Sequence, residues 1–166
     1  ERGCSVSPLF GSPGVRSSRF QMDWLHVADL GVTADVLGNI LKMLLGKMAG
    51  GTDKDRCGNL FLDITTYYNN TAVDSRLDNL TLSMLGKAGK PPKLRAKGAE
   101  ARFLVPYALE ATQRLLAQDH PVEGAARQLV AHLAACYDCL SSATFNAAVL
   151  RENSRKFALL FVALEA

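Results

Sequence analysis

Apolar residues recur every three or four positions along most of this chain, which is the spacing of an amphipathic helix. Six such stretches predict helices over residues 33–49, 60–68, 77–85, 99–116, 121–140 and 145–164. Thr33 is the predicted N-cap of the first helix, Pro121 suits the first turn of the fifth, and Pro106 is expected to start or kink the fourth. The sequence therefore predicts a mainly α protein of five or six amphipathic helices that pack through their apolar stripes.

The N-terminal region follows a different pattern. Residues 1–18 are rich in Gly, Pro and Ser, which predicts a loop. Apolar and polar residues alternate from Phe20 to Asp23, which predicts one short strand within residues 19–27. A single strand cannot pair its own backbone groups, so we expect its sheet neighbours to lie in sequence upstream of this chain. The predicted organisation is a loop (1–18), a strand and turn (19–32) and a helical domain (33–166).

Composition limits the class of protein. The chain has 166 residues, 48% of them apolar and 21% charged, which is enough apolar material for a core. The longest apolar run, residues 157–164, is far shorter than the roughly 20 residues of a membrane span, so no membrane partner is expected. Four cysteines are too few for a disulfide framework and no signal peptide is present, so we expect a nuclear or cytoplasmic protein that is not secreted. A net charge of +3 does not by itself indicate nucleic acid.

Residues 22–32 hold the densest cluster of chemically versatile side chains. The carboxylates of Asp23 and Asp29 flank the imidazole of His26 and the indole of Trp24. A carboxylate at the end of a strand is a suitable ligand for Mg²⁺ or Mn²⁺, because both ions prefer hard oxygen ligands. The alternative is structural: the two aspartates cap turns or a helix start, and His26 and Trp24 pack against the core.

The segment F-Q-M-D-W-L-H-V-A-D-L-G-V, residues 20–32, resembles the Asp-x-x-His-x-x-Asp-Leu-Gly-Val stretch of eukaryotic DDE-type transposases and their degenerate relatives. In that family a ribonuclease-H-like core is interrupted by a helical insertion. The resemblance implies that Asp23 is the second metal-binding carboxylate and that His26 is its motif companion, beside the metal or against DNA. It also implies that Gly31 lies at the turn into the insertion and that the following helices are the insertion domain.

The resemblance implies that this chain is a fragment of an active site. Two-metal phosphoryl transfer needs several carboxylates from different strands, and the motif supplies only the middle one. The first Asp is expected upstream of residue 1 and the closing Glu beyond the insertion; Glu152 and Glu165 lack a matching motif and are not assigned. The expected function of the complete protein, or of a domesticated or decayed relative, is metal-dependent cleavage and transfer of DNA strands. This chain alone is expected to bind Mg²⁺ or Mn²⁺ weakly and to cut nothing.

A basic run follows the third predicted helix. Its candidate nucleic-acid-binding residues are Lys90, Lys93, Arg95, Lys97 and Arg102. Flexible cations can contact phosphates and release counterions, which gives affinity without sequence specificity. The alternative is a solvated loop, because no aromatic residue is interleaved for base stacking. The expected partner is DNA, and the helical region is a further candidate for homo-oligomer contacts.

His132, Cys136 and Cys139 share one helix face. A zinc site needs a fourth ligand, usually from a second segment, and none has a paired spacing here, so we expect these residues to continue the apolar stripe rather than to bind zinc. Two rival functions follow from the helices alone. The first is a non-catalytic module that presents a groove to a protein partner; the weaker second is a metal-sensing bundle that uses the His132 face.

Overall fold

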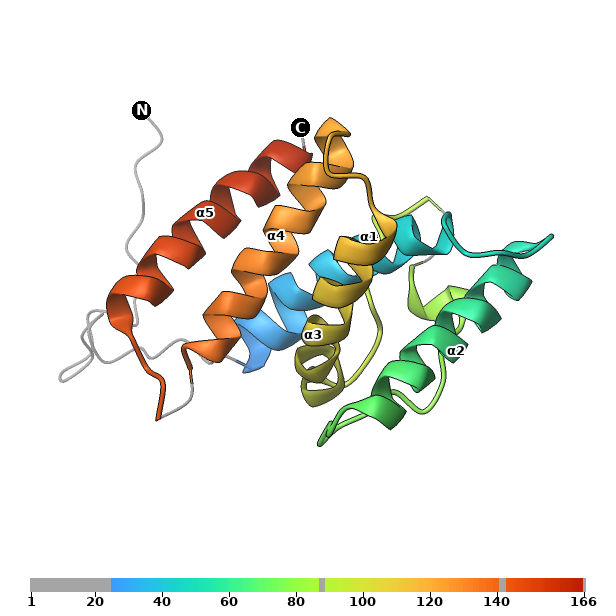
Figure 1. Cartoon of the computed structure of the whole chain (residues 1–166), viewed down its shortest axis with the longest axis horizontal. Helices are drawn as coiled ribbons and strands as arrows, with labels where there is room; N and C mark the ends of the chain where they lie inside the picture. The colour runs from blue at the N-terminus through green and yellow to red at the C-terminus, as the bar shows by residue number, and fades with distance from the viewer. Residues whose placement is uncertain (1–24, 87–88, 141–142, 166) are drawn as a thin grey trace, which may run out of the picture.

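The computed structural model describes residues 25–86, 89–140 and 143–165. These residues contain no strand, and most of them are helical, so the mainly α prediction is confirmed (Figure 1). The elements in chain order are η3 (Leu25–Val32), α1 (Thr33–Leu45), α2 (Asp53–Asn70), η4 (Leu82–Met84), α3 (Gly98–Leu115), α4 (Pro121–Asp138) and α5 (Ala147–Glu165).

Helix α1 is the centre of the structure. It contacts η3, α2, α3 and α4, whereas α5 packs chiefly on α4. Figure 1 shows the resulting order, with α5 at one end, α2 at the other and the remaining helices between them. A helix that is surrounded in this way is apolar on most of its circumference. The buried residues of α1 are Thr33, Ala34, Val36, Leu37, Gly38, Ile40, Leu41, Leu44 and Leu45.

The helix starts follow local sequence signals. The side chain of Thr52 accepts the N–H of Asp55, and Asp55 accepts the N–H of Thr52, which forms a capping box at the start of α2. Pro121 occupies the first turn of α4, as predicted. Pro106 does not start α3, because the helix already begins at Gly98 and continues through the proline.

The predicted N-terminal strand does not extend over Leu25–Val27. These residues are helical within η3, so the described part of residues 19–32 is a helix and not a strand and turn. The alternation that predicts a strand ends at Asp23, and residues 1–24, which include the predicted loop and the rest of that strand, lie outside the described residues. The ribonuclease-H-like core therefore stays a prediction.

Segment η3 runs directly into α1 with a kink at Gly31, so Thr33 is not an N-cap. The Thr33 hydroxyl instead forms a 2.8 Å hydrogen bond with the Tyr137 hydroxyl on α4. Tyr137 also donates to the buried carboxylate of Asp29, at 2.5 Å. Asp29 before the kink and Thr33 after it therefore meet the same tyrosine of α4.

The helix predicted over residues 77–85 is also wrong. Leu77, Leu80 and Leu85 are buried as the spacing suggests, but the only helical turn in this stretch is η4. Two carbonyls of this stretch accept hydrogen bonds from other segments. The Leu80 carbonyl accepts the thiol of Cys57, and the Met84 carbonyl accepts the N–H of Arg95. The apolar spacing predicted which side chains are buried but not the backbone conformation between them.

A polar group joins α2 to α3. The hydroxyl of the buried Tyr107 donates to Asp63 at 2.8 Å, and Arg114 donates to the same carboxylate oxygen at 2.6 Å. Two effects chiefly raise the pKa of Tyr107 above its usual value: burial of the phenol is the larger, and its hydrogen bond to Asp63 is the smaller. The phenol therefore stays protonated and remains a donor.

No helix in the described part of the chain is both long enough and apolar enough to span a bilayer.

Glu123 links α4 to two other parts of the fold. Its carboxylate accepts hydrogen bonds from the Lys47 ammonium and from the Ala117 N–H, both at 2.7 Å. These two hydrogen bonds hold the pKa of Glu123 below its usual value, and the one from Lys47 has the larger effect. The native state then binds fewer protons than the unfolded state, so this stabilisation is present above the unfolded pKa of about 4.3 and is lost as the pH falls through the lower native pKa.

We therefore expect Glu123→Gln to lose less stability than the wild type between neutral pH and about pH 3. Urea midpoints at both pH values measure the difference. Glu110→Gln removes an exposed carboxylate of α3 as a control and should keep the acid sensitivity of the wild type. Equal pH dependence in all three proteins would contradict the role assigned to Glu123.

Candidate functional site

Residues 89–97 form an irregular connector that leads into α3 and is fastened to its neighbours by main-chain hydrogen bonds. The N–H of Leu94 donates to the carbonyl of Ala34 in α1, and the N–H of Arg95 donates to the carbonyl of Met84, both at 2.8 Å. The Leu94 side chain is only 2% exposed and belongs to the core. The connector therefore has a fixed position, although it has no regular secondary structure.

A glycine in α1 permits this close approach. A Cβ atom at Gly38 would lie 2.5 Å from both Cα and N of Lys93 and 2.7 Å from N of Leu94. Atoms at these distances overlap, so the connector can lie here only because position 38 has no side chain. The close contact holds Lys93 and its neighbours over the N-terminal half of α1.

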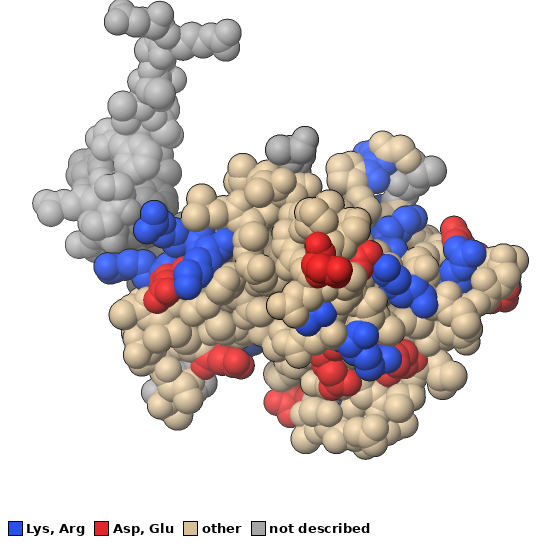
Figure 2. Space-filling view, turned by 45° about the horizontal axis from the view of Figure 1, so that its top comes forward, with Lys and Arg blue, Asp and Glu red and all other residues tan. Residues whose placement is uncertain are grey.

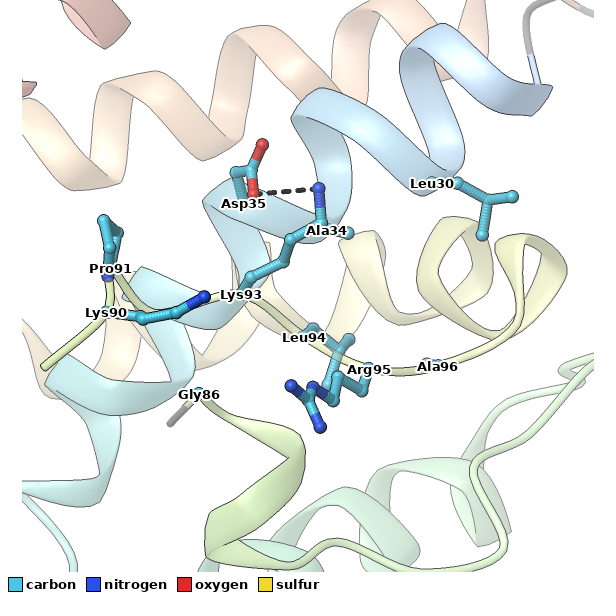
Figure 3. A pocket seen from close by; sticks show the side chains of 10 residues that line it. All are labelled: Leu30, Ala34, Asp35, Gly86, Lys90, Pro91, Lys93, Leu94, Arg95 and Ala96. Atoms are coloured by element: carbon cyan, nitrogen blue, oxygen red, sulfur yellow. Dashed lines mark ion pairs between the residues drawn. The ribbon is translucent and has the colours of Figure 1, made fainter. Parts of the chain in front are cut away.

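The connector, η3 and α1 enclose a cavity of about 540 Å³, which we term the basic cavity. Three of the predicted nucleic-acid-binding residues, Lys90, Lys93 and Arg95, line it together with Asp35 (Figure 3). The other lining residues are small or apolar: Leu30, Ala34, Gly86, Pro91, Leu94 and Ala96.

The charges in the basic cavity are only partly neutralised. Lys93 forms a 3.1 Å ion pair with Asp35, drawn as a dashed line in Figure 3. Within the part of the chain that the structure describes, no acidic side chain pairs with Lys90 or Arg95. Three cations and one carboxylate leave two net positive charges around the cavity. An anion is therefore the ligand that this cavity favours.

The other two predicted basic residues lie elsewhere. Lys97 forms a 3.0 Å ion pair with Glu100 in the first turn of α3, and this contact raises the pKa of Lys97. The guanidinium of Arg102 lies 5.4 Å from the ring centre of Tyr137, a cation–π contact. Figure 2 shows a similar mixture on a larger scale, because blue and red side chains are interspersed over the visible face. The basic run is thus divided between the cavity and two structural contacts.

The structure places only part of the transposase-like motif. Asp23 lies outside the described residues, and His26 is exposed on η3 without lining the basic cavity. Asp29 is 5% exposed and accepts the Tyr137 hydroxyl. Burial is the larger cause, and the hydrogen bond to Asp29 the smaller cause, of a raised pKa of Tyr137. The raised pKa keeps the phenol protonated, so Tyr137 remains a donor. Asp29 therefore has a structural role, because it joins η3 to α4 through Tyr137.

Two of the three candidate zinc ligands, His132 and Cys136, contact α5. Nδ1 of His132 lies 2.8 Å from Oδ1 of Asn153, and Sγ of Cys136 lies 3.6 Å from Oγ of Ser154. Burial raises the pKa of the Cys136 thiol, which disfavours the thiolate form that binds metals. Among the described residues, no three His, Cys, Asp or Glu side chains are close enough to hold a metal ion together.

The wall of the basic cavity that faces the connector was not predicted. Leu30, Ala34 and Asp35 come from η3 and α1, far from the connector in sequence. One signal could have indicated a tertiary contact here: an isolated glycine inside a helical pattern, such as Gly38, often has a packing reason.

Comparison with known proteins gives no family for this chain. No family model, no curated protein and no solved structure matches it. The likeness to DDE-type transposases therefore has no support from these comparisons and stays a prediction from the sequence.

Proposed function

We propose that this chain is part of a DDE-type transposase, or of a domesticated or decayed relative, and that its helical region contacts the DNA backbone. The motif around Asp23 and the helical region that follows it support the family. The basic cavity supports the contact with DNA, because Lys90 and Arg95 have no acidic partner among the described residues and the buried Leu94 fixes the backbone between Lys93 and Arg95. This arrangement of the connector is the observation that carries the proposal.

The cations act on phosphates and not on bases. Lys and Arg side chains that neutralise phosphates release condensed counterions, and the affinity gained is independent of sequence. In this role the connector positions DNA beside the helical region, and sequence recognition belongs to other parts of the complete protein. A function on DNA implies that the protein works in the nucleus.

The catalytic part of the proposal concerns residues 20–32. Asp23 would hold Mg²⁺ or Mn²⁺ together with carboxylates from other strands, and His26 would lie beside the metal or the DNA. Two cations about 4 Å apart need more than one carboxylate. We therefore expect this chain alone to bind DNA without cutting it, in the presence or absence of Mg²⁺.

The test is the salt dependence of binding to a DNA duplex. We compare the wild type with Lys90→Ala/Lys93→Ala/Arg95→Ala and with a control, Lys42→Ala/Lys54→Ala/Arg155→Ala, which removes three exposed cations outside the cavity. Each phosphate contact contributes about 0.9 to the slope of log K against log salt, so the cavity variant should lose up to about 2.7 from the slope. The control should keep most of the wild-type slope.

Two outcomes would contradict the proposal. Equal slopes for the cavity variant and the control variant would show that the connector does not contact DNA phosphates. Cleavage of the duplex by this chain with Mg²⁺, abolished by Asp23→Ala, would show that the chain holds a complete active site, contrary to the expectation above.

A second function, a helical module that binds a protein partner, is favoured by α5. Leu159 and Val162, on the outer side of this helix, are 63% and 66% exposed. Apolar side chains on one helix face are a common feature of helix-mediated recognition. Equal salt slopes in the experiment above would favour this function over DNA binding.

A further inference from the structure

We propose that the basic cavity binds a terminal phosphate monoester that is joined to an organic group with apolar surface. This ligand chemistry occurs in the 5′-phosphorylated end of a DNA strand and in a free nucleoside monophosphate. The inference deepens the proposed function, on which its DNA form depends, because it specifies a strand end rather than the duplex backbone.

The size and lining of the cavity suit such a ligand. Its volume of about 540 Å³ lies within the range of small-molecule sites, about 300–1,000 Å³, and exceeds what a bare phosphate fills. The cations come from the connector, whereas Leu30 and Ala34 supply apolar surface from η3 and α1. A ligand with one charged end and one apolar body matches this division.

The charge favours a monoester over an internal phosphodiester. Lys90, Lys93 and Arg95 outnumber Asp35 by two charges. A phosphate monoester carries about 1.5 to 2 negative charges at neutral pH, whereas each backbone phosphate of DNA carries one. A terminal phosphate therefore neutralises the cavity more completely.

Asp35 opposes the binding of an anion in the cavity. Its carboxylate is 3.1 Å from the Lys93 ammonium and lines the same space, so an incoming phosphate competes with it for Lys93 and is repelled by it. The ion pair is partly exposed, so its loss should change the stability of the fold little. Asp35→Asn should therefore bind the phosphate more tightly than the wild type, an effect that a purely structural ion pair would not produce.

The first arm of the test uses small ligands and titration calorimetry. We expect adenosine 5′-monophosphate to bind at least about tenfold more tightly than inorganic phosphate, and adenosine not to bind measurably. Asp35→Asn should increase the affinity for the nucleotide several-fold, and Lys90→Ala/Arg95→Ala should reduce it about tenfold or more. Lys42→Ala/Lys54→Ala, outside the cavity, should leave it unchanged.

The second arm uses a short single-stranded oligonucleotide with either a 5′-phosphate or a 5′-hydroxyl. We expect the phosphorylated form to bind several-fold more tightly, and the nucleotide to compete with it. Circular dichroism and thermal unfolding confirm that each variant is folded.

The outcomes separate the inference from the proposed function. Suppose that Lys90→Ala/Lys93→Ala/Arg95→Ala lowers the duplex salt slope, but that a 5′-phosphate does not strengthen oligonucleotide binding and the nucleotide does not compete. The inference then fails and the proposed function stands. If the nucleotide binds and Asp35→Asn tightens it, but DNA does not bind, the inference stands with the free nucleotide as its source and the proposed function fails. No affinity for the nucleotide and no effect of the 5′-phosphate overturn the inference.

Discussion

Gly38→Ala should destabilise the protein by about 2 kcal/mol, although alanine is the better helix former. The new methyl group would lie 2.5 Å from the backbone of Lys93, and backbone cannot move aside as the end of a flexible side chain can. The connector must shift away from α1, which weakens the hydrogen bond between the Leu94 N–H and the Ala34 carbonyl. The free energy of unfolding, measured in urea, gives the size of the effect.

Gly58→Ala is the matched control for this prediction. Gly58 is exposed within α2, and a Cβ atom there would meet nothing within 4 Å. The same substitution should therefore stabilise the protein by up to about 1 kcal/mol, because alanine restricts the unfolded chain and favours the helix. Similar changes in both variants would contradict the close contact assigned to Gly38.

The connection between stability and the site can also be measured. Because the Gly38 contact holds the connector and its cations beside the η3 and α1 residues that line the basic cavity, a displaced connector should bind anions more weakly as well as fold less stably. Gly58→Ala should leave anion binding unchanged. The pair of glycines thus separates a general loss of stability from a specific loss of cavity geometry.

The helices were predictable where local signals and tertiary packing agree. In α4, Pro121 suits a first helical turn and the apolar stripe continues to the end of the helix, so the sequence predicts both its position and its buried face. The stretch from Leu77 to Leu85 has a similar apolar spacing but a different backbone, and its carbonyls at Leu80 and Met84 accept donors from distant segments. Spacing predicts burial in both cases, and only long-range hydrogen bonds distinguish the helix from the loop.

The candidate site was predictable on one side only. Lys90, Lys93 and Arg95 are close in sequence, and their clustering is visible without a structure. Asp35 becomes their neighbour only because the connector crosses α1 at Gly38, and an isolated glycine in a helical pattern does not say which segment approaches it. The sequence therefore predicted the cations but not the cavity, and the division of charge and apolar surface became visible only in the fold.

Tyr137→Phe should have the other large effect, a loss of about 3 kcal/mol in the free energy of unfolding. Asp29 is buried, and the Tyr137 hydroxyl that donates to its carboxylate also bonds the Thr33 hydroxyl. Phenylalanine keeps the ring and its packing but removes the donor, so the carboxylate is left buried without this partner. Leaving a buried charge unsatisfied costs more than the net value of the bond itself.

A double-mutant cycle distinguishes this explanation from a simple loss of contact. Asp29→Ala alone should cost less than Tyr137→Phe, because Thr33 remains as a partner for the tyrosine hydroxyl. Asp29→Ala/Tyr137→Phe should be more stable than Tyr137→Phe alone, since no buried charge then remains. Urea unfolding of the four proteins measures the coupling. If the losses of unfolding free energy in the two single variants simply add in the double variant, the Asp29 carboxylate does not depend on Tyr137. The structural role assigned to Asp29 is then wrong.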